Sequence, residues 1–300
     1  MNNSIDILKS IYKPYRYTIK GKSTLIETTT GDYIIKEKNK DIIELYNYLK
    51  SRGFTNYPKL IDGSRKDVNV YEYIEDIKIP KEQKFDDLID TIALLHYKTS
   101  YYKEVSEDTY KRIYEDIKSN ISYLENYYNL LYDNGFKEVF TSPSNYELMR
   151  NYNHIIAALN YASKELDDWY TMIKGETKIR VSIVHNNLEY NHFLENENNY
   201  LISWDNYGVD TPIKDIVKLY KKEYRNINFS NCLSKYIEKY PLLEYEKKLL
   251  FILLTIPPVI NEEKTEFNKC INCSKMLDYV YKTEDLLRPY ITEDKKEKQE

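Results

Sequence analysis

Short alternating runs of hydrophobic and polar residues fill the first 75 residues and are typical of a small β-sheet. Three segments rich in Thr, Ile and Tyr, separated by glycine-containing turns, predict three strands: Arg16–Ile19, Thr24–Thr28 and Tyr33–Lys36. A further strand is predicted at Val68–Ile74 (VNVYEYI). Between these strands, Asp41–Arg52 repeats apolar residues at helical spacing, and Gly53 follows it as a stop signal.

The rest of the chain has the longer periodicity of helices. Apolar residues recur at intervals of three and four, which predicts helices at Phe85–Thr99, 108–135, 145–173, Thr211–Tyr220, Tyr245–Ile256 and Cys270–Leu287. We therefore expect an α+β, bilobal protein. Its parts are a β-rich lobe over residues 1–74, a helical lobe over 75–290 and a disordered, charged tail over 291–300.

Composition and charge exclude several classes of partner. The chain has 300 residues, a formal net charge of −4 and 31% charged residues, and no basic run precedes an Asn-rich or aromatic cluster, so we expect no nucleic-acid partner. The longest apolar run, Leu249–Ile260, contains two prolines and is shorter than the roughly 20 residues that cross a membrane. The first ten residues lack a secretion-signal pattern, and three cysteines form no even disulfide framework, so we expect a cytoplasmic protein.

Candidate chemistry is concentrated in Val181–Asp215. Two short apolar runs, Val181–Val184 and Tyr200–Trp204, are joined by a polar turn, and each ends in polar residues. Functional side chains at the ends of strands are a common way to build a site. The spacing is His-x-Asn-x4-His from residue 185, then Ser-Trp at 203 and an aspartate at 215.

This arrangement resembles the catalytic core of the aminoglycoside phosphotransferase and choline kinase group, within the protein-kinase-like fold. In that group H-x-D-x4-N is followed by a strand ending in I-D-W or I-D-F and by a structural aspartate. The resemblance extends from Lys36 to about Leu287 and implies a bilobal kinase-like fold. Three positions depart from the pattern: Asn187 replaces the catalytic aspartate, His192 the metal-binding asparagine and Ser203 the metal-binding aspartate.

The same resemblance implies roles for other residues. His185 and Asp215 take the places of structural residues, and His96 resembles a structural histidine on a helix. The resemblance assigns nucleotide-phosphate binding to Lys36, a supporting ion pair with Lys36 to Glu44, and adenine binding to the backbone of Glu72, Tyr73 and Ile74. The alternatives are that Lys36 is a solvated strand lysine and that Glu44 is a surface residue. The chain has no G-x-G-x-x-G loop to cradle phosphates.

The three departures argue against efficient phosphoryl transfer. Asn187 cannot accept a proton at neutral pH. Magnesium favours carboxylate and phosphate oxygens, whereas Ser203 is neutral and His192 offers nitrogen. We therefore predict a catalytically impaired pseudokinase that requires no cofactor. The resemblance implies ATP as a possible ligand, whereas the neutral side chain at Ser203 and the nitrogen ligand at His192 disfavour Mg²⁺.

Several alternatives remain. Asp205 and Glu189 each lie two residues beyond a lost position, and in an extended chain they would face the same way as the residues they replace. They would then serve an active ATP-dependent kinase of small molecules. A zinc site from His185, His192 and Asp205 is a further alternative, as is nucleotide binding without Mg²⁺ through Lys36.

Two C-terminal features complete the sequence picture. Cys270-x-x-Cys273 is half of a zinc or redox motif, and its apolar neighbours favour buried cysteines on a helix. The helix ending in Ile256-Pro257-Pro258 resembles the spore coat S branch of the superfamily. That resemblance implies a binding or assembly protein with protein partners and a place in the spore coat.

Overall fold

The computed structural model describes residues 8–21, 23–63, 65, 67–261 and 263–297, with the side chains of 107 and 292–297 left aside. Contacts along the chain divide it into two compact units. Unit 1 comprises Met1–Ser100 and Ser182–Asp215, and unit 2 comprises Tyr101–Val181 and Ile216–Glu300. The sequence led us to expect a boundary at residue 74. Unit 1 instead continues to Ser100 and includes the distant segment Ser182–Asp215.

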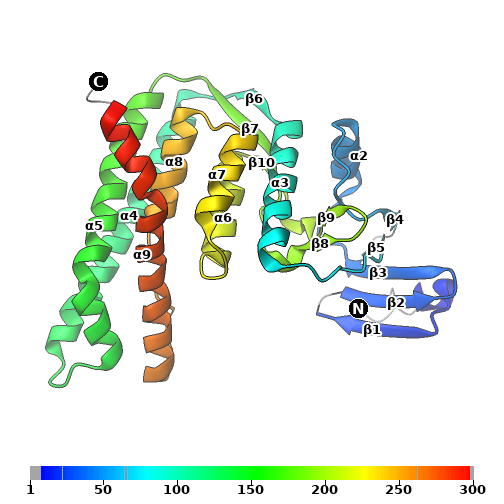
Figure 1. Ribbon diagram of the computed structural model, residues 1–300, viewed down its shortest axis with the longest axis horizontal. Coiled ribbons are helices and arrows are strands. Elements are labelled where there is room, and N and C mark those ends of the chain that lie inside the picture. Colours follow the sequence, from blue (N-terminus) through cyan, green and yellow to red (C-terminus); the bar gives the residue numbers. More distant parts are fainter. Residues whose placement is uncertain (1–7, 22, 64, 66, 262, 298–300) are drawn as a thin grey trace. The chain divides into compact units, whose positions relative to one another are not determined.

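Unit 1 contains a five-stranded antiparallel sheet in the order β1-β2-β3-β5-β4 (Figure 1). Its strands are β1 (Arg16–Lys20), β2 (Ser23–Thr28), β3 (Gly31–Glu37), β4 (Leu60–Asp62) and β5 (Val68–Glu72). The three N-terminal strands and the strand from residue 68 were expected from alternation of polar and apolar residues. Strand β4 was not, because three residues are too few to show a period of two.

The sheet buries one of its faces. Ile26, Ile35, Val68 and Val70 form a cluster with Leu8, and each is at most 4% exposed. Full burial of such a side chain stabilises the fold by about 1.5–3 kcal/mol. Helix α2 (Ile43–Ser51) buries Leu45, Tyr46 and Leu49, which share one face because they are spaced by three and four residues. Gly53 follows this helix with a φ of +73°, where glycine carries no steric penalty.

The remainder of unit 1 is built around helix α3 and the segment that begins at Ser182. Helix α3 spans Lys81–Thr99, and strand β7 (Lys178–Val184) pairs with β10 (Gly208–Asp210) through Ser182–Val184. Strands β8 (Phe193–Glu195) and β9 (Asn199–Leu201) form a hairpin. The strand expected at Tyr200–Trp204 ends at Leu201. Ser203 has a left-handed backbone with a φ of +66°, and Trp204–Asn206 is a 3₁₀ turn.

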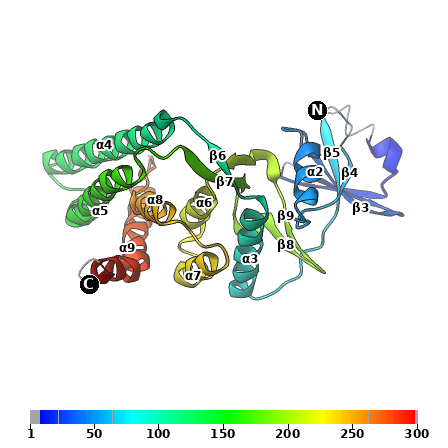
Figure 2. The same ribbon diagram turned by 90° about the horizontal axis from the view of Figure 1, so that it is seen from above.

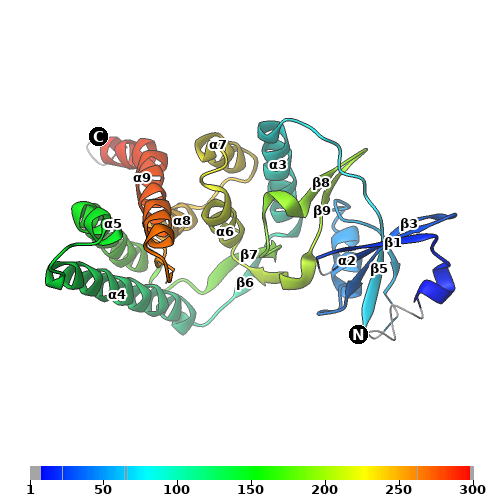
Figure 3. The same cartoon turned by 90° about the horizontal axis from the view of Figure 1, so that it is seen from below.

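Unit 2 is mainly helical. Strand β6 (Tyr101–Glu104) pairs with the first half of β7, and helices α4 (Glu107–Lys137) and α5 (Pro143–Ile173) lie side by side (Figure 2). Helix α6 (Ile213–Glu223) continues into this unit and is followed by α7 (Phe229–Lys239). Helices α8 (Glu244–Thr255) and α9 (Glu266–Glu297) both contact α5 (Figure 3). The predicted α+β fold class is thus confirmed.

The C-terminal region differs from expectation in its last part. Helix α9 continues to Glu297, so the described portion of the segment expected to be disordered is helical. Lysine and glutamate are good helix formers, which explains the extension. Cys270 is half-buried and Cys273 is 2% exposed on the same helix, and burial raises the pKa of the Cys273 thiol to about 11. Within the described part of the chain, no helix is long and apolar enough to span a membrane.

Candidate functional site

A cavity of about 410 Å³ lies within unit 1. Its walls come from β2 and β3, from the segment that follows β5, and from the chain between residues 191 and 205. The predicted site residues that line it are Lys36, Glu72, Tyr73, Ile74, Ser203 and Asp205. This volume is within the range typical of small-molecule sites.

Lys36 is held at the cavity wall by strand β3, where it pairs in register with Asn69 of β5. Its ammonium forms an ion pair with the Asp205 carboxylate and donates to Ser203 Oγ at 3.4 Å. The lysine side chain is 17% exposed and the aspartate 26% exposed. Two residues far apart in sequence therefore place a positive and a negative charge at one wall of the cavity.

Glu44 does not take the expected place beside Lys36. It is exposed on α2, and it is not one of the residues that line the cavity. The ammonium of Lys36 contacts Asp205 and Ser203 instead. The supporting carboxylate expected from the helix thus comes from the loop after β9.

The chain after β5 presents an open backbone position to the cavity. The Glu72 N–H donates to Lys59 O at 3.0 Å, and the Tyr73 N–H donates to Asp32 O at 3.1 Å. The backbone N–H and C=O of Ile74 make no hydrogen bond to any other described residue. Backbone polar groups are normally paired, so this pair is available to a planar ligand with a donor and an acceptor on one edge.

Aromatic side chains form part of the cavity wall. Tyr46 and Tyr71 both line it, and burial raises the pKa of each phenol. Ile34 and Ile202 add aliphatic surface. An apolar wall with a few convergent polar groups suits a ligand that has a flat, apolar part and a charged part.

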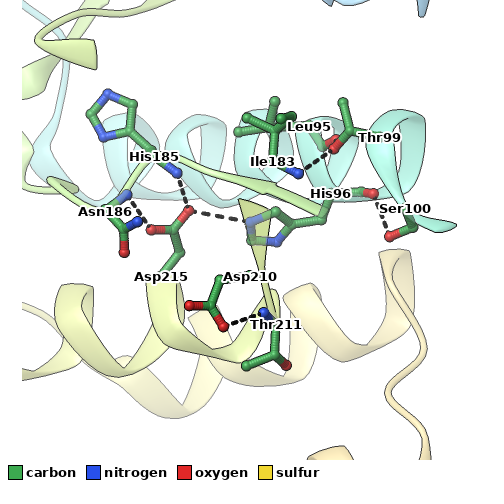
Figure 4. A network of polar contacts seen from close by, with 10 residues as sticks. All are labelled: Leu95, His96, Thr99, Ser100, Ile183, His185, Asn186, Asp210, Thr211 and Asp215. Atoms are coloured by element: carbon green, nitrogen blue, oxygen red, sulfur yellow. Dashed lines mark hydrogen bonds and ion pairs between the residues drawn. The ribbon is translucent and has the colours of Figure 1, made fainter. Parts of the chain in front are cut away.

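Asp215 organises the loop that precedes the cavity (Figure 4). Its carboxylate is fully buried and accepts the backbone N–H groups of His185 and Asn186, each at 2.7 Å. The His96 Nε2 lies 3.3 Å from the same carboxylate. Burial alone would raise the pKa of Asp215, but the contact with His96 and the other hydrogen bonds lower it. The buried charge is therefore stabilised by hydrogen bonds, in keeping with a structural role.

His185 also has a structural environment. Its Nε2 lies 2.9 Å from Ile202 O, and its ring packs edge-on against Trp204 with centroids 4.7 Å apart. Burial lowers the pKa of His185 to about 4, although Asp215 opposes that effect. The ring is accordingly neutral at pH 7 and donates to the carbonyl, which ties the loop at residue 185 to the chain before Ser203.

The two altered positions in the following loop contact each other. His192 Nδ1 donates to Asn187 O at 2.7 Å, and His192 Nε2 lies 3.0 Å from the Glu189 carboxylate. Neither Asn187 nor Glu189 is among the residues that line the cavity. Glu189, considered above as a relocated carboxylate, is instead engaged by His192.

Asn191 is a cavity residue that sequence reasoning missed. The spacing of the motif places the functional residue at 192, but the 3₁₀ turn Tyr190–His192 brings Asn191 to the cavity and directs the His192 ring toward the loop. The signal in the sequence was the amide of Asn191, one position before the residue that the motif spacing selects. Only the geometry of the turn could have indicated its importance.

The residues at the cavity do not form a typical magnesium set. Asp205 is paired with Lys36, and Asp76, the other aspartate at the cavity, is paired with Lys84 at 2.6 Å. In the described residues no group of three or more His, Cys, Asp or Glu side chains gathers at metal-binding distances. The zinc alternative is also disfavoured, because both His192 nitrogens contact the protein and Asp205 is paired with Lys36, although His185 Nδ1 has no hydrogen-bond partner among the described residues.

Comparison with known proteins gives matches in structure. No family model matches the sequence, and no curated protein does. The fold is similar to an aminoglycoside phosphotransferase from Alicyclobacillus acidocaldarius, with a TM-score of 0.68, 10% identity and 93% of each chain covered.

A second similar structure is spectinomycin phosphotransferase APH(9)-Ia. Its complex with AMP gives a TM-score of 0.54 at 14% identity, with 84% of each chain covered. Its complex with ADP and spectinomycin gives the same TM-score and identity, with 94% of this chain and 97% of that chain covered. The resemblance seen in the motif at residues 185–215 is thus confirmed at the level of the fold: this chain has the protein-kinase-like fold of the aminoglycoside phosphotransferases.

Proposed function

We propose that this protein binds a nucleotide in the unit 1 cavity and is impaired in phosphoryl transfer, so that it acts as a pseudokinase with a binding or assembly role. The observation that carries the proposal is the contrast between this cavity and the loop that precedes it. The cavity keeps a lysine and an open backbone position at Ile74, whereas the position of the catalytic aspartate is Asn187.

Nucleotide binding is supported by the arrangement of the retained groups. Ile74 offers a backbone donor and acceptor to a base, the tyrosines offer apolar walls, and Lys36 offers a positive charge to phosphates. The nucleotide complexes of the structurally similar spectinomycin phosphotransferase favour the same class of ligand. ATP and ADP are therefore the ligands to test first.

Impaired transfer is supported by the missing groups. Phosphoryl transfer needs a residue that orients the acceptor hydroxyl and ligands that hold the metal ion. An amide at residue 187 cannot accept a proton, and both aspartates at the cavity, Asp205 and Asp76, are paired with lysines. We expect ADP binding that is independent of Mg²⁺ and no transfer to small alcohols.

The first test is calorimetric titration of ADP, without and with Mg²⁺, into the wild type and Lys36→Met. Loss of the ammonium should weaken binding about tenfold or more, because one partly buried charge contact to phosphate is removed. Lys50→Met is the matched control, since Lys50 is exposed on α2 and does not line the cavity. Equal affinity in the wild type and Lys36→Met would refute anchoring by Lys36.

The second candidate function is an active ATP-dependent kinase of small molecules that uses Asp205 as a relocated carboxylate. The observation in its favour is that Asp205 lines the cavity beside Lys36. Glu189 does not support this alternative, because it contacts His192 and does not line the cavity. Mg²⁺-dependent phosphorylation of any small alcohol by the wild type, abolished in Lys36→Met, would establish it and overturn the pseudokinase proposal.

Asp205→Asn separates the two functions. In Mg²⁺-free binding, Asp205 competes with phosphate oxygens for Lys36 and repels them, so its neutralisation should raise ADP affinity by about threefold to tenfold. In an active kinase the same change removes a metal ligand and weakens binding of Mg²⁺-ATP.

The spore-coat type of assembly role is supported by the sequence resemblance at Ile256–Pro258 and is proposed on that ground.

A further inference from the structure

A second cavity, of about 650 Å³, lies within unit 2 and plays no part in the proposed nucleotide site. It is formed by the end of α6 and the loop after it, by residues 258–261 between α8 and α9, and by one face of α9. Four of its lining residues are cationic: Lys221, Lys222, Arg225 and Lys275. None of the described lining residues is acidic.

Two of these cations have no partner among the described residues. Arg225 is paired with Asp278 at 3.1 Å, so its charge is compensated. The ammonium groups of Lys221 and Lys275 make no hydrogen bond or ion pair with the described residues. The Lys221 side chain is exposed to solvent. The protein atoms around its ammonium nevertheless lower the pKa of that group through burial. Two ammonium groups from different helices that line one cavity, without a counter-charge among the described residues, attract an anion.

A simple structural explanation accounts for part of this cluster. Lys221 and Lys222 lie in the last turn of α6, where the helix dipole favours positive charge. That effect does not apply to Lys275, which lies well inside α9 and contributes its charge from a different element. Three lysines from two helices around one cavity thus exceed what a helix terminus requires.

The remaining walls restrict the class of ligand. Tyr224, Met276 and Tyr279 provide apolar surface, and the side chains of Asn226 and Asn272 are occupied by neighbouring groups. The closest described acid on the connecting segment, Glu263, accepts from Asn272 at 3.5 Å. The volume fits a small molecule rather than a single hydrated ion.

We propose that this cavity is a binding site for a small polyanion, a molecule that carries two or more phosphate or carboxylate groups. Lys221 and Lys275 contact the anionic groups, and the tyrosine and methionine surface contacts the carbon skeleton. The site is independent of the nucleotide cavity, because every described residue that lines it belongs to unit 2.

The experiment is calorimetric titration of the full chain with pyrophosphate and with citrate, at ionic strength matched by sodium chloride. Binding of either probe should be about tenfold weaker or more in Lys221→Gln/Lys275→Gln. The charge-matched control is Lys103→Gln/Lys174→Gln, which removes two exposed unit 2 lysines that do not line the cavity. The Lys221→Gln/Lys275→Gln pair should cause the same loss in a Lys36→Met background, which separates this site from the nucleotide cavity.

Hydrogen exchange on the wild type gives a second measurement that needs no variant. Pyrophosphate or citrate should protect residues 221–226, 258–261 and 263–276, whether or not residues around Lys36 are also protected. The proposal is overturned if neither probe binds, if the control pair loses as much affinity as the site pair, or if residues 221–226, 258–261 and 263–276 stay unprotected. Whichever of the two probes binds more tightly identifies phosphate or carboxylate as the preferred group.

Discussion

Asp215 shows how one buried carboxylate fixes the geometry of a functional loop. Its two oxygens bind consecutive backbone N–H groups at His185 and Asn186, and Asn186 has a left-handed backbone with a φ of +61°. Such a conformation is uncommon for a residue other than glycine and is maintained by its surroundings. The position of the chain before Asn187 therefore depends on a residue almost 30 positions away.

We expect Asp215→Asn to lower the free energy of unfolding at pH 7 by about 3 kcal/mol, because an amide cannot accept all three hydrogen bonds. The folded-state pKa of Asp215 is lowered, so its contribution is present above the unfolded pKa of about 4 and is lost as pH falls through the folded pKa. The difference between wild type and variant in urea unfolding should consequently shrink from pH 7 to pH 3.

Asp210→Asn is the control for this measurement. Asp210 is 37% exposed and accepts the Thr211 N–H at 2.8 Å, a role that asparagine can also fill. Its effect should be within about 1 kcal/mol at both pH values. A pH-independent loss in Asp215→Asn would show that the carboxylate charge contributes nothing.

At the scale of elements, helix α3 is attached to strand β7 by a side chain rather than by a strand partner. Strand β6 pairs with β7 only as far as Tyr101 and Val181. Two residues further on, the Ile183 N–H donates to Thr99 Oγ1 at 3.1 Å, and that hydroxyl donates to Leu95 O at 2.7 Å (Figure 4). The end of α3 thus supplies the acceptor that the strand lacks at this point.

Thr99→Val tests this attachment. The valine has nearly the same shape but leaves the buried Ile183 N–H without a partner, so the free energy of unfolding should fall by about 1–3 kcal/mol. Chemical denaturation measures this loss. Thr99→Ser keeps the hydroxyl and should recover most of it, whereas equal losses in both variants would mean that the methyl group, not the hydrogen bond, stabilises the junction.

At the scale of the whole molecule, the chain provides one natural probe for each unit. It contains two tryptophans. Trp204 lies in unit 1 and lines the unit 1 cavity, and Trp169 is fully buried in unit 2, where its Nε1 donates to Tyr245 O at 3.0 Å. Single-tryptophan variants can therefore report on each unit separately.

In Trp169→Phe, whose fluorescence comes from Trp204, ADP at about 100 times its Kd should raise the free energy of unfolding by about 2.7 kcal/mol. In Trp204→Phe, the transition reported by Trp169 should move less, because the ligand contacts unit 1. Urea titrations followed by fluorescence measure both. Equal shifts would show that the two units unfold as one cooperative structure.

Much of the fold could be predicted from the sequence because its determinants are local. The strands from residue 16 to 37 follow alternation of polar and apolar residues, and α3, α4 and α5 follow helical periodicity over many turns. Strands β4, β8 and β10 have three residues each, too few for a period to be recognised. They form because neighbouring strands offer unpaired backbone groups, which only the tertiary structure reveals.

The candidate site divides in the same way. The spacing of His185, Asn187, Ser203 and Asp215 is a property of the sequence, and it predicted the kinase-like fold that the structure has. The impaired chemistry that it also favours stays a prediction. The ion pair of Lys36 with Asp205 joins residues 169 positions apart, and the turn that presents Asn191 depends on the contacts of His192. The sequence determined which groups are available, and folding decided which of them meet, because contacts between distant residues arise only when the elements that carry them pack together.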